Sequence, residues 1–175
     1  VSLGTASTAT EGTDYSTVSD ITISAGATTG TTTFTPTDDS MYETSTNETA
    51  IISIDSVSGG SAAENGTQAV TITITENESA PTVTLAVSAT SIAENAGSSL
   101  TLTATLSGTT SQDVTVALSS SSSATEGTDY GTVSDITISS GSTTGTASFT
   151  PTDDSLYDAS SNETAIIAIS GVSGG

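Results

Sequence analysis

The side chains of this chain that could do chemistry are almost all carboxylates. Of its 175 residues, 20 are Asp or Glu and none is Lys, Arg, His or Cys, so the formal net charge is −20. Adjacent acids occur at Asp38-Asp39 and again at Asp153-Asp154. Neighbouring negative charges repel unless a cation lies between them, and carboxylate oxygens are the ligands that Ca²⁺ prefers. The residues therefore offer the chemistry of a hard metal ion, unless the charges are simply spread over the surface.

Catalysis finds little support among the same residues. A nucleophile with its general base needs His, Lys or Cys in most enzymes, and the chain has none of the three. No Gly-rich loop for phosphate is present. Paired acids can hydrolyse glycosides, but aromatic residues make up only 3% of the chain and offer no platform for a sugar. We therefore expect that the protein is not an enzyme.

The charge also limits the partners. Without a cationic side chain nothing can neutralise phosphate, so nucleic acid and anionic membrane surfaces are excluded as partners. No apolar run approaches the ~20 residues that span a bilayer, so we expect no direct membrane insertion. The absence of Cys rules out disulfides, and the absence of Lys rules out Lys–Asn isopeptide cross-links. The fold must be stabilised by other means, for which a bound cation is a candidate.

The acidic pairs recur because the chain repeats itself. Residues 1–60 align without a gap with residues 116–175, and 43 of the 60 positions are identical. A period of 115 residues is the size of a domain and too long for one turn of a solenoid. The repeat therefore predicts a tandem array of whole domains. Such near-identical neighbours are typical of a long extracellular or cell-surface stalk or fibre, which gains length by copying a module.

Alternating apolar and Thr residues predict the elements that must position the acids. This period of two is typical of half-buried strands, with β-branched Thr on the outer face. Gly- and Asn-containing turn signals separate the stretches, and no helical stripe is present. We predict an all-β fold, an immunoglobulin-like Greek-key β-sandwich in tandem repeat of period 115. The predicted strands are 70–75, 83–87, 100–106, 114–118, 136–138, a stretch around Phe149, and 167–169.

Four short motifs resemble those of the Calx-beta domains, which are immunoglobulin-like β-sandwiches of sodium–calcium exchangers, integrin β4 and many large bacterial surface proteins. They are Ile92-Ala93-Glu94-Asn95, Gly127-Thr128-Asp129-Tyr130, the acidic run 153–158, and the closing Glu76-Asn77-Glu78. The resemblance implies that residues 1–79 are a repeat lacking its first two strands and that residues 80–175 are a repeat lacking its last strand. Such partial repeats fit either a window from a longer array or a subunit completed by a neighbour's strands. The short covalent linker at 76–81 favours the window.

The resemblance further implies Ca²⁺ ligands at one end of each sandwich. Third in each acidic run stands a Ser, Ser40 or Ser155, where the family often has a third Asp, so we expect one or two ions per site. The alternative is a calcium-free family member whose loop acids are merely solvated. In the first repeat the implied ligands are Asp14, Asp38, Asp39, Met41 through its carbonyl, Glu43, Glu48, Glu76 and Glu78. In the second they are Glu94, Asp129, Asp153, Asp154, Leu156 through its carbonyl, Asp158 and Glu163.

Other marked residues are expected to have no role in the site. Glu11 and Glu126 lie beside the ligand motif without being implied ligands. Tyr15 and Tyr130 are expected to pack against the end of the core. The sequons at Asn47, Asn65, Asn77 and Asn162 are acceptors for N-linked glycans where the source has the machinery, although a chain so rich in Ser and Thr also forms them by chance.

The expected function is structural. We predict a repeat of an extracellular fibre, stalk or giant adhesin that is rigidified by calcium at domain ends and junctions. Its partners would be neighbouring repeats of the same chain or identical subunits of a fibre. The alternative is a calcium-sensing or ligand-binding module of a larger receptor or transporter. Near-identity of adjacent repeats favours the first, because sensor modules usually diversify.

Overall fold

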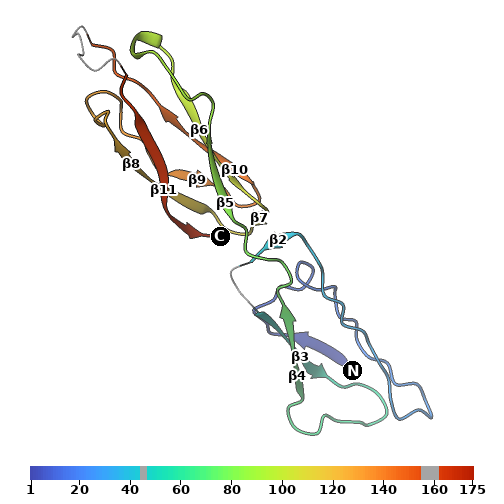
Figure 1. The fold of residues 1–175 in the computed structure, drawn as a ribbon. Helices are drawn as coiled ribbons and strands as arrows, with labels where there is room; N and C mark the ends of the chain where they lie inside the picture. Colours follow the sequence, from blue (N-terminus) through green and yellow to red (C-terminus); the bar gives the residue numbers. More distant parts are fainter. Residues whose placement is uncertain (44–46, 155–161) are drawn as a thin grey trace. The chain divides into compact units, whose positions relative to one another are not determined.

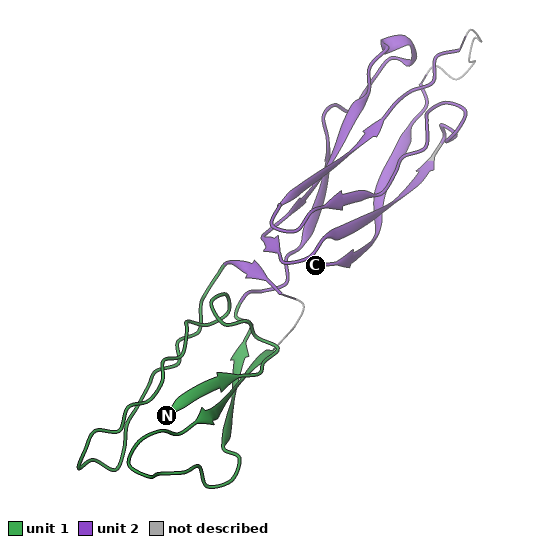
Figure 2. Ribbon diagram, turned by 180° about the vertical axis from the view of Figure 1, so that it is seen from behind, with its two compact units in different colours: residues 1–39, 45–77 green, residues 40–44, 78–175 purple. Residues whose placement is uncertain are grey.

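The computed structural model describes residues 1–43, 47–154 and 162–175, and within these ranges the regular structure is all-β apart from one 3₁₀ turn. The predicted fold class is confirmed, and all seven predicted strands form. The chain divides into two compact units, which Figure 2 distinguishes by colour. Unit 1 comprises Val1–Asp39 and Ser45–Asn77, and unit 2 comprises Ser40–Thr44 and Glu78–Gly175. The proposed division into repeats at residue 79 stays a prediction.

Unit 2 is built from two three-stranded antiparallel sheets (Figure 1), of strand order β10-β6-β5 and β11-β8-β9. Each strand alternates apolar and polar side chains, so each sheet has one apolar face to bury. The bounds are β5 (Val83–Val87), β6 (Leu100–Leu106), β7 (Thr109–Thr110), β8 (Val114–Ser122), β9 (Ile136–Ile138), β10 (Thr144–Phe149) and β11 (Ala165–Gly174), with the 3₁₀ turn η1 (Glu94–Ala96) between β5 and β6.

The apolar faces of the two sheets meet in one core. Leu102, Ala104 and Leu106 of β6 are buried there together with side chains of β8 and β9. Ile136 and Ile138 of β9 are 0% exposed. Because buried residues come from both sheets, unit 2 is a β-sandwich.

A short strand from earlier in the chain completes unit 2. Strand β2 (Met41–Tyr42) pairs in parallel with β7. The hydroxyl of Thr109 donates to the Ser40 carbonyl at 3.1 Å, and the amide of Ser111 donates to the Tyr42 carbonyl at 3.0 Å. These bonds explain why Ser40–Thr44 belongs to unit 2 although it lies within the first sequence repeat.

Unit 1 has a single antiparallel sheet of order β1-β3-β4, formed by β1 (Ser2–Thr5), β3 (Asn47–Ser56) and β4 (Ala69–Thr75). Its small core is made by Ala9, Tyr15 and Ala50, with partly buried neighbours that include Phe34. The rings of Tyr15 and Phe34 stack with centroids 4.8 Å apart, and Tyr130 and Phe149 repeat this pair in unit 2 at the same distance. Both tyrosines are 1% exposed, so the prediction that they pack against the core is confirmed.

The same sequence adopts different structure in the two units. Residues 21–23 and 29–34 are the equivalents of β9 and β10 at the period of 115, yet neither segment is a strand, and Figure 1 draws them without arrows. Ile23 is 48% exposed, whereas its equivalent Ile138 is fully buried. In unit 2, β10 is held by pairing with β6. The described residues of unit 1 include no counterpart of β6, so residues 29–34 have no such partner strand there.

Candidate metal centre

The predicted ligands of unit 2 lie where its strands end. Strand β6 pairs antiparallel with both β5 and β10, with Leu102 opposite Val87 and Leu100 opposite Phe149. The β5–β6 connection, which carries Glu94, therefore lies at the same end of this sheet as the segment that follows β10. Asp153 and Asp154 are in that segment, so the strand register alone brings acids from two connections together.

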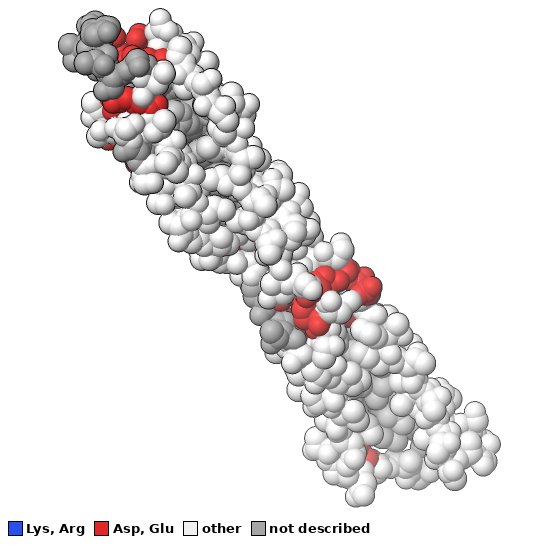
Figure 3. Space-filling model, in the orientation of Figure 1, with Lys and Arg blue, Asp and Glu red and all other residues white. Residues whose placement is uncertain are grey.

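The second sheet of unit 2 contributes acids at this same end. Asp129 lies in the turn after β8, and Glu163 precedes β11, which pairs antiparallel with β8. The turn is joined to the other sheet by a bridge between Tyr130 and Pro151. The amide of Thr152 also donates to the Asp129 carbonyl at 2.9 Å. Figure 3 shows acidic side chains gathered at this end of unit 2.

The Asp129 carboxylate is fixed by its own turn. Its Oδ2 accepts a hydrogen bond from the Thr125 amide at 2.6 Å, while its amide donates to the Thr125 carbonyl at 2.9 Å. Gly127 adopts a φ of 85°, which favours glycine at this position. The turn recurs in unit 1, where Asp14 Oδ2 accepts from the Thr10 amide at 2.5 Å. The Gly-Thr-Asp-Tyr motif thus encodes a rigid support for one half-buried carboxylate in each repeat.

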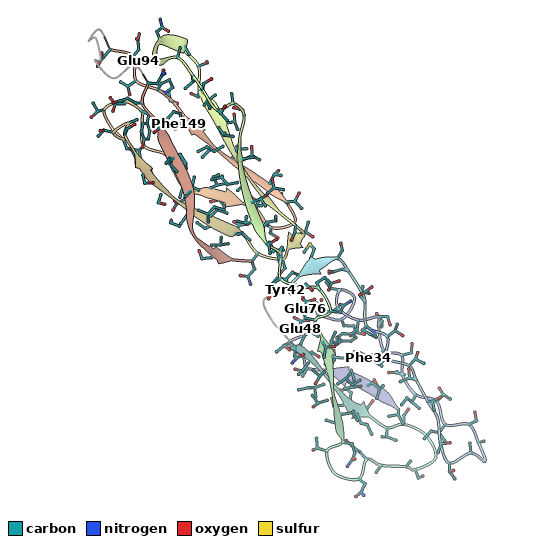
Figure 4. All side chains as sticks on the ribbon, in the orientation of Figure 1. Phe34, Tyr42, Glu48, Glu76, Glu94 and Phe149 are labelled. Atoms are coloured by element: carbon teal, nitrogen blue, oxygen red, sulfur yellow. The ribbon has the colours of Figure 1, made fainter. Side chains whose placement is uncertain are left out.

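Glu94 connects two of the predicted ligand segments directly. Its Oε1 accepts a hydrogen bond from the backbone amide of Asp154 at 3.1 Å. Figure 4 shows Glu94 at the end of unit 2. The acid of the 3₁₀ turn and the acidic pair after β10 are therefore adjacent in space.

Unit 1 gathers its own acids by the same logic. Glu48 begins β3 opposite Ile74 of β4, and Glu76 follows two residues later, so the two carboxylates leave the sheet on the same side. Figure 4 shows both at the same end of the unit. The amide of Thr37 donates to the Asp14 carbonyl at 2.9 Å, which ties the turn of Asp14 to the segment that carries Asp38 and Asp39.

Asn77 holds Asp38, which sequence reasoning did not predict. Its Nδ2 donates to Asp38 Oδ1 at 3.0 Å across 39 residues of sequence. The only signal in the sequence was the position of Asn77 between Glu76 and Glu78, where we considered it solely as a glycan acceptor. The remaining implied ligands divide as follows: Asp39 is in unit 1, Met41, Glu43 and Glu78 are in unit 2, and Leu156 and Asp158 lie outside the described residues.

In the described ranges 1–43, 47–154 and 162–175, no three acidic side chains come close enough together to hold a metal ion. The structure thus brings the predicted acids to one end of each unit without assembling a complete coordination sphere, and the ligand list stays a prediction. The donor chemistry fits Ca²⁺, since it consists of carboxylates and carbonyls. It does not fit a zinc site, which uses His and Cys, because the chain contains neither.

The family model of the Calx-beta domain matches the chain twice, over residues 1–78 and 76–173. The chain belongs to the Calx-beta family. Calx-beta domains are non-catalytic, calcium-binding β-sandwich modules, typically parts of extracellular or membrane proteins. No curated protein and no solved structure matches the chain. In the part of the chain that the structure describes, no helix has the length and apolarity to cross a membrane.

Several acids of these Calx-beta repeats have a structural role instead. Glu126 accepts hydrogen bonds from the Ser120 hydroxyl at 2.9 Å and the Val133 amide at 3.1 Å, and so bridges β8 to the loop before β9. Asp135 accepts from the Leu118 amide at 2.9 Å. Sequence reasoning left both residues out of the ligand set. Their backbone contacts make them useful controls for substitutions in the site.

Proposed function

We propose that this Calx-beta chain is a calcium-binding structural repeat of an extracellular fibre, stalk or adhesin, stiffened by the ion at domain ends and junctions. One observation carries the proposal: both repeats place acids in equivalent positions at the end of a β-sandwich, in a chain without a single cationic side chain. Asp14, Asp38, Asp39 and Glu48 all recur unchanged 115 residues later, and Glu43 recurs as the acid Asp158.

Electrostatics supports a divalent ion at these positions. Two unit charges 4 Å apart near a protein surface interact by about 4 kcal/mol, so several carboxylates at one end of a unit destabilise it when no counter-charge is present. Surface ion pairs cannot relieve this repulsion, because the chain has no Lys or Arg. A calcium ion would convert the repulsion into coordination, and its binding would stabilise the folded state by mass action.

The calcium part of the proposal is tested with the whole chain. Titration calorimetry should show saturable Ca²⁺ binding with one or two ions per repeat. The melting temperature should rise in calcium relative to a chelator, by an amount that corresponds to about 2.7 kcal/mol when free calcium is 100 times its Kd. NaCl at matched ionic strength controls for simple screening. No binding heat together with equal melting temperatures would contradict the proposal.

The mechanical part needs a separate measurement. If the repeat serves as a stiff element, removal of calcium should increase chain flexibility. Small-angle scattering of the whole chain would report this as a changed maximum dimension and a less compact Kratky profile. Unchanged scattering with and without calcium would leave a calcium-binding module that does not stiffen a fibre.

A further inference from the structure

Unit 1 presents a groove that the corresponding part of unit 2 fills. The groove of unit 1 has a volume of about 330 Å³ and is lined by Phe34 and Pro36 on one side and by Ile72 and Ile74 of β4 on the other. Its lining is mainly apolar, although unit 1 has a small core. Apolar surface of this kind gains free energy when it is removed from water.

The internal repeat shows which element belongs beside residues 29–34. Their equivalent β10 pairs along its whole length with β6, from Thr144 opposite Thr105 to Phe149 opposite Leu100. Four of the six positions of this segment are identical in the two repeats, including Gly30 with Gly145 and Phe34 with Phe149. The segment of unit 1 therefore carries the same capacity for strand pairing.

The backbone of unit 1 already follows the path that such pairing requires. A Cβ built on Gly30 would lie 2.5 Å from the Thr22 carbonyl oxygen, and one on Gly145 would lie 2.4 Å from the carbonyl oxygen of Thr137. Residues 29–34 thus cross residues 21–23 as closely as β10 crosses β9. What differs is the cover: the side chain of Ile23 is 48% exposed and that of Ile138 is buried.

We propose that residues 29–34 form a strand-acceptor site, and that its occupant is a β-hairpin of another repeat with the sequence of residues 83–106. The register follows from unit 2, with Leu100 opposite Phe34 and Ala104 opposite Gly30. The hairpin's second strand supplies the backbone pairing, and its alternate Leu and Ala side chains enter the groove, as in strand addition to an open sheet edge.

Charge also suits this occupant. The strands Val83–Val87 and Leu100–Leu106 contain no acidic residue, so their docking adds no repulsion to a chain of net charge −20. The single acid between them is Glu94, in the turn. The inference concerns unit 1 alone and does not depend on calcium.

The test adds the occupant to the complete chain and follows hydrogen exchange. One sample carries a copy of residues 80–115 directly before Val1, which continues the period of 115, and a second receives a synthetic peptide of residues 82–107 in trans. Amides of residues 29–34 should exchange at least about tenfold more slowly in both cases, because they become paired. Amides of β10, already paired with β6, should not change, and they serve as the internal control.

A register-swapped hairpin is the matched control. Exchanging Leu and Thr along residues 100–103 keeps the composition and turns the apolar side chains to the opposite face, so protection should be lost. Ile72→Thr in the groove should weaken peptide binding, whereas Val70→Thr on an exposed part of the same strand should not. Unchanged exchange at 29–34 with the fused hairpin, or equal protection by the swapped one, would overturn the proposal. Protection that instead grows with concentration of the chain alone, with dimers in sedimentation, would show that a second copy covers the face.

Discussion

The carboxylate of Glu94 and the backbone amide of Asp154 are hydrogen-bonded at 3.1 Å although 60 residues separate them in sequence. The bond links the connection between β5 and β6 to the acidic segment after β10. It uses one carboxylate oxygen on a backbone donor, so the arrangement of the acids does not depend on repelling side chains alone. Glu94 is therefore placed both to support the acidic segment and to act as a ligand.

Asp153 is the residue whose substitution should weaken calcium binding most directly. Asp153→Asn keeps the size of the side chain and removes one anionic ligand, and calcium affinity falls with the charge count of the ligands. We expect calorimetry of the whole chain to show a Kd at least about tenfold higher for the sites of unit 2, or about 1.4 kcal/mol.

Asp135→Asn is the control for this change. It removes the same charge from unit 2 at a residue bonded to the Leu118 amide and not implied as a ligand. Its Kd for calcium should stay within about twofold of the original value, since long-range screening weakens remote charges. Equal losses of affinity in the two variants would show that net charge, and not a ligand set, governs calcium binding.

Asp129→Asn should have two separable effects. The substitution removes a predicted ligand, and it also weakens the acceptor for the Thr125 amide in the turn. We expect weaker calcium binding and, in chelator, a loss of stability of about 1 kcal/mol, because hydrogen bonds to charged groups are worth more than neutral ones. Urea unfolding in chelator isolates the second effect. A variant that loses stability in chelator but binds calcium normally would assign Asp129 to the turn alone.

Ile138 and Ile23 offer a test of how complete each core is. Ile138→Ala removes a fully buried side chain and should destabilise unit 2 by about 2–5 kcal/mol. Ile23→Ala at the equivalent, 48% exposed position should cost unit 1 about 1 kcal/mol or less. Hydrogen exchange resolved by peptide reports the two units separately. Equal costs would mean that Ile23 is covered in solution.

The sequence predicted most of the fold because its strands are encoded locally. Leu100, Leu102 and Leu106 alternate with Thr, and this period of two was sufficient to identify β6 and the similar strands. Locally encoded strength fails for residues 29–34, which have nearly the sequence of β10 but form no strand, because a ladder needs a partner that local sequence does not supply. The pairing of Met41–Tyr42 with Thr109–Thr110 was equally hidden, since two-residue strands carry no periodic signal.

The candidate site was predictable in composition but not in contacts. Acid motifs at fixed positions of both repeats predicted which end of the sandwich is anionic. The bonds of Glu94 to Asp154 and of Asn77 to Asp38 join residues 60 and 39 positions apart, and only the assembled sheets bring them together. Hydrogen bonds of this range depend on strand register, which a motif does not specify.

Proteolysis gives a further check on the calcium proposal. Trypsin has no cleavage site in a chain without Lys and Arg, so resistance to it says nothing about folding. Proteinase K cleaves broadly, and its rate follows the open population when reclosing is fast. We expect slow digestion in calcium and digestion at least about tenfold faster in chelator, which corresponds to about 1.4 kcal/mol of lost stability. Similar rates in both conditions would contradict a calcium-stabilised fold.

Gly145 should be the most sensitive glycine of unit 2 to substitution. A Cβ at this position would lie 2.4 Å from the carbonyl oxygen of Thr137 and 2.8 Å from Cγ2 of Ile136, so β10 could no longer pass so close to β9. Glycine inside a strand often marks such a close backbone approach. Overpacking of a well-packed site costs about 1–3 kcal/mol, and we expect Gly145→Ala to lie at the upper end because the nearest contact is backbone. Gly108→Ala is the control, since its Cβ would meet nothing within 4 Å, and it should change stability by less than about 0.5 kcal/mol. Urea unfolding with peptide-resolved hydrogen exchange measures both. If Gly145→Ala proved as harmless as Gly108→Ala, the close crossing of β9 and β10 would not exist in solution.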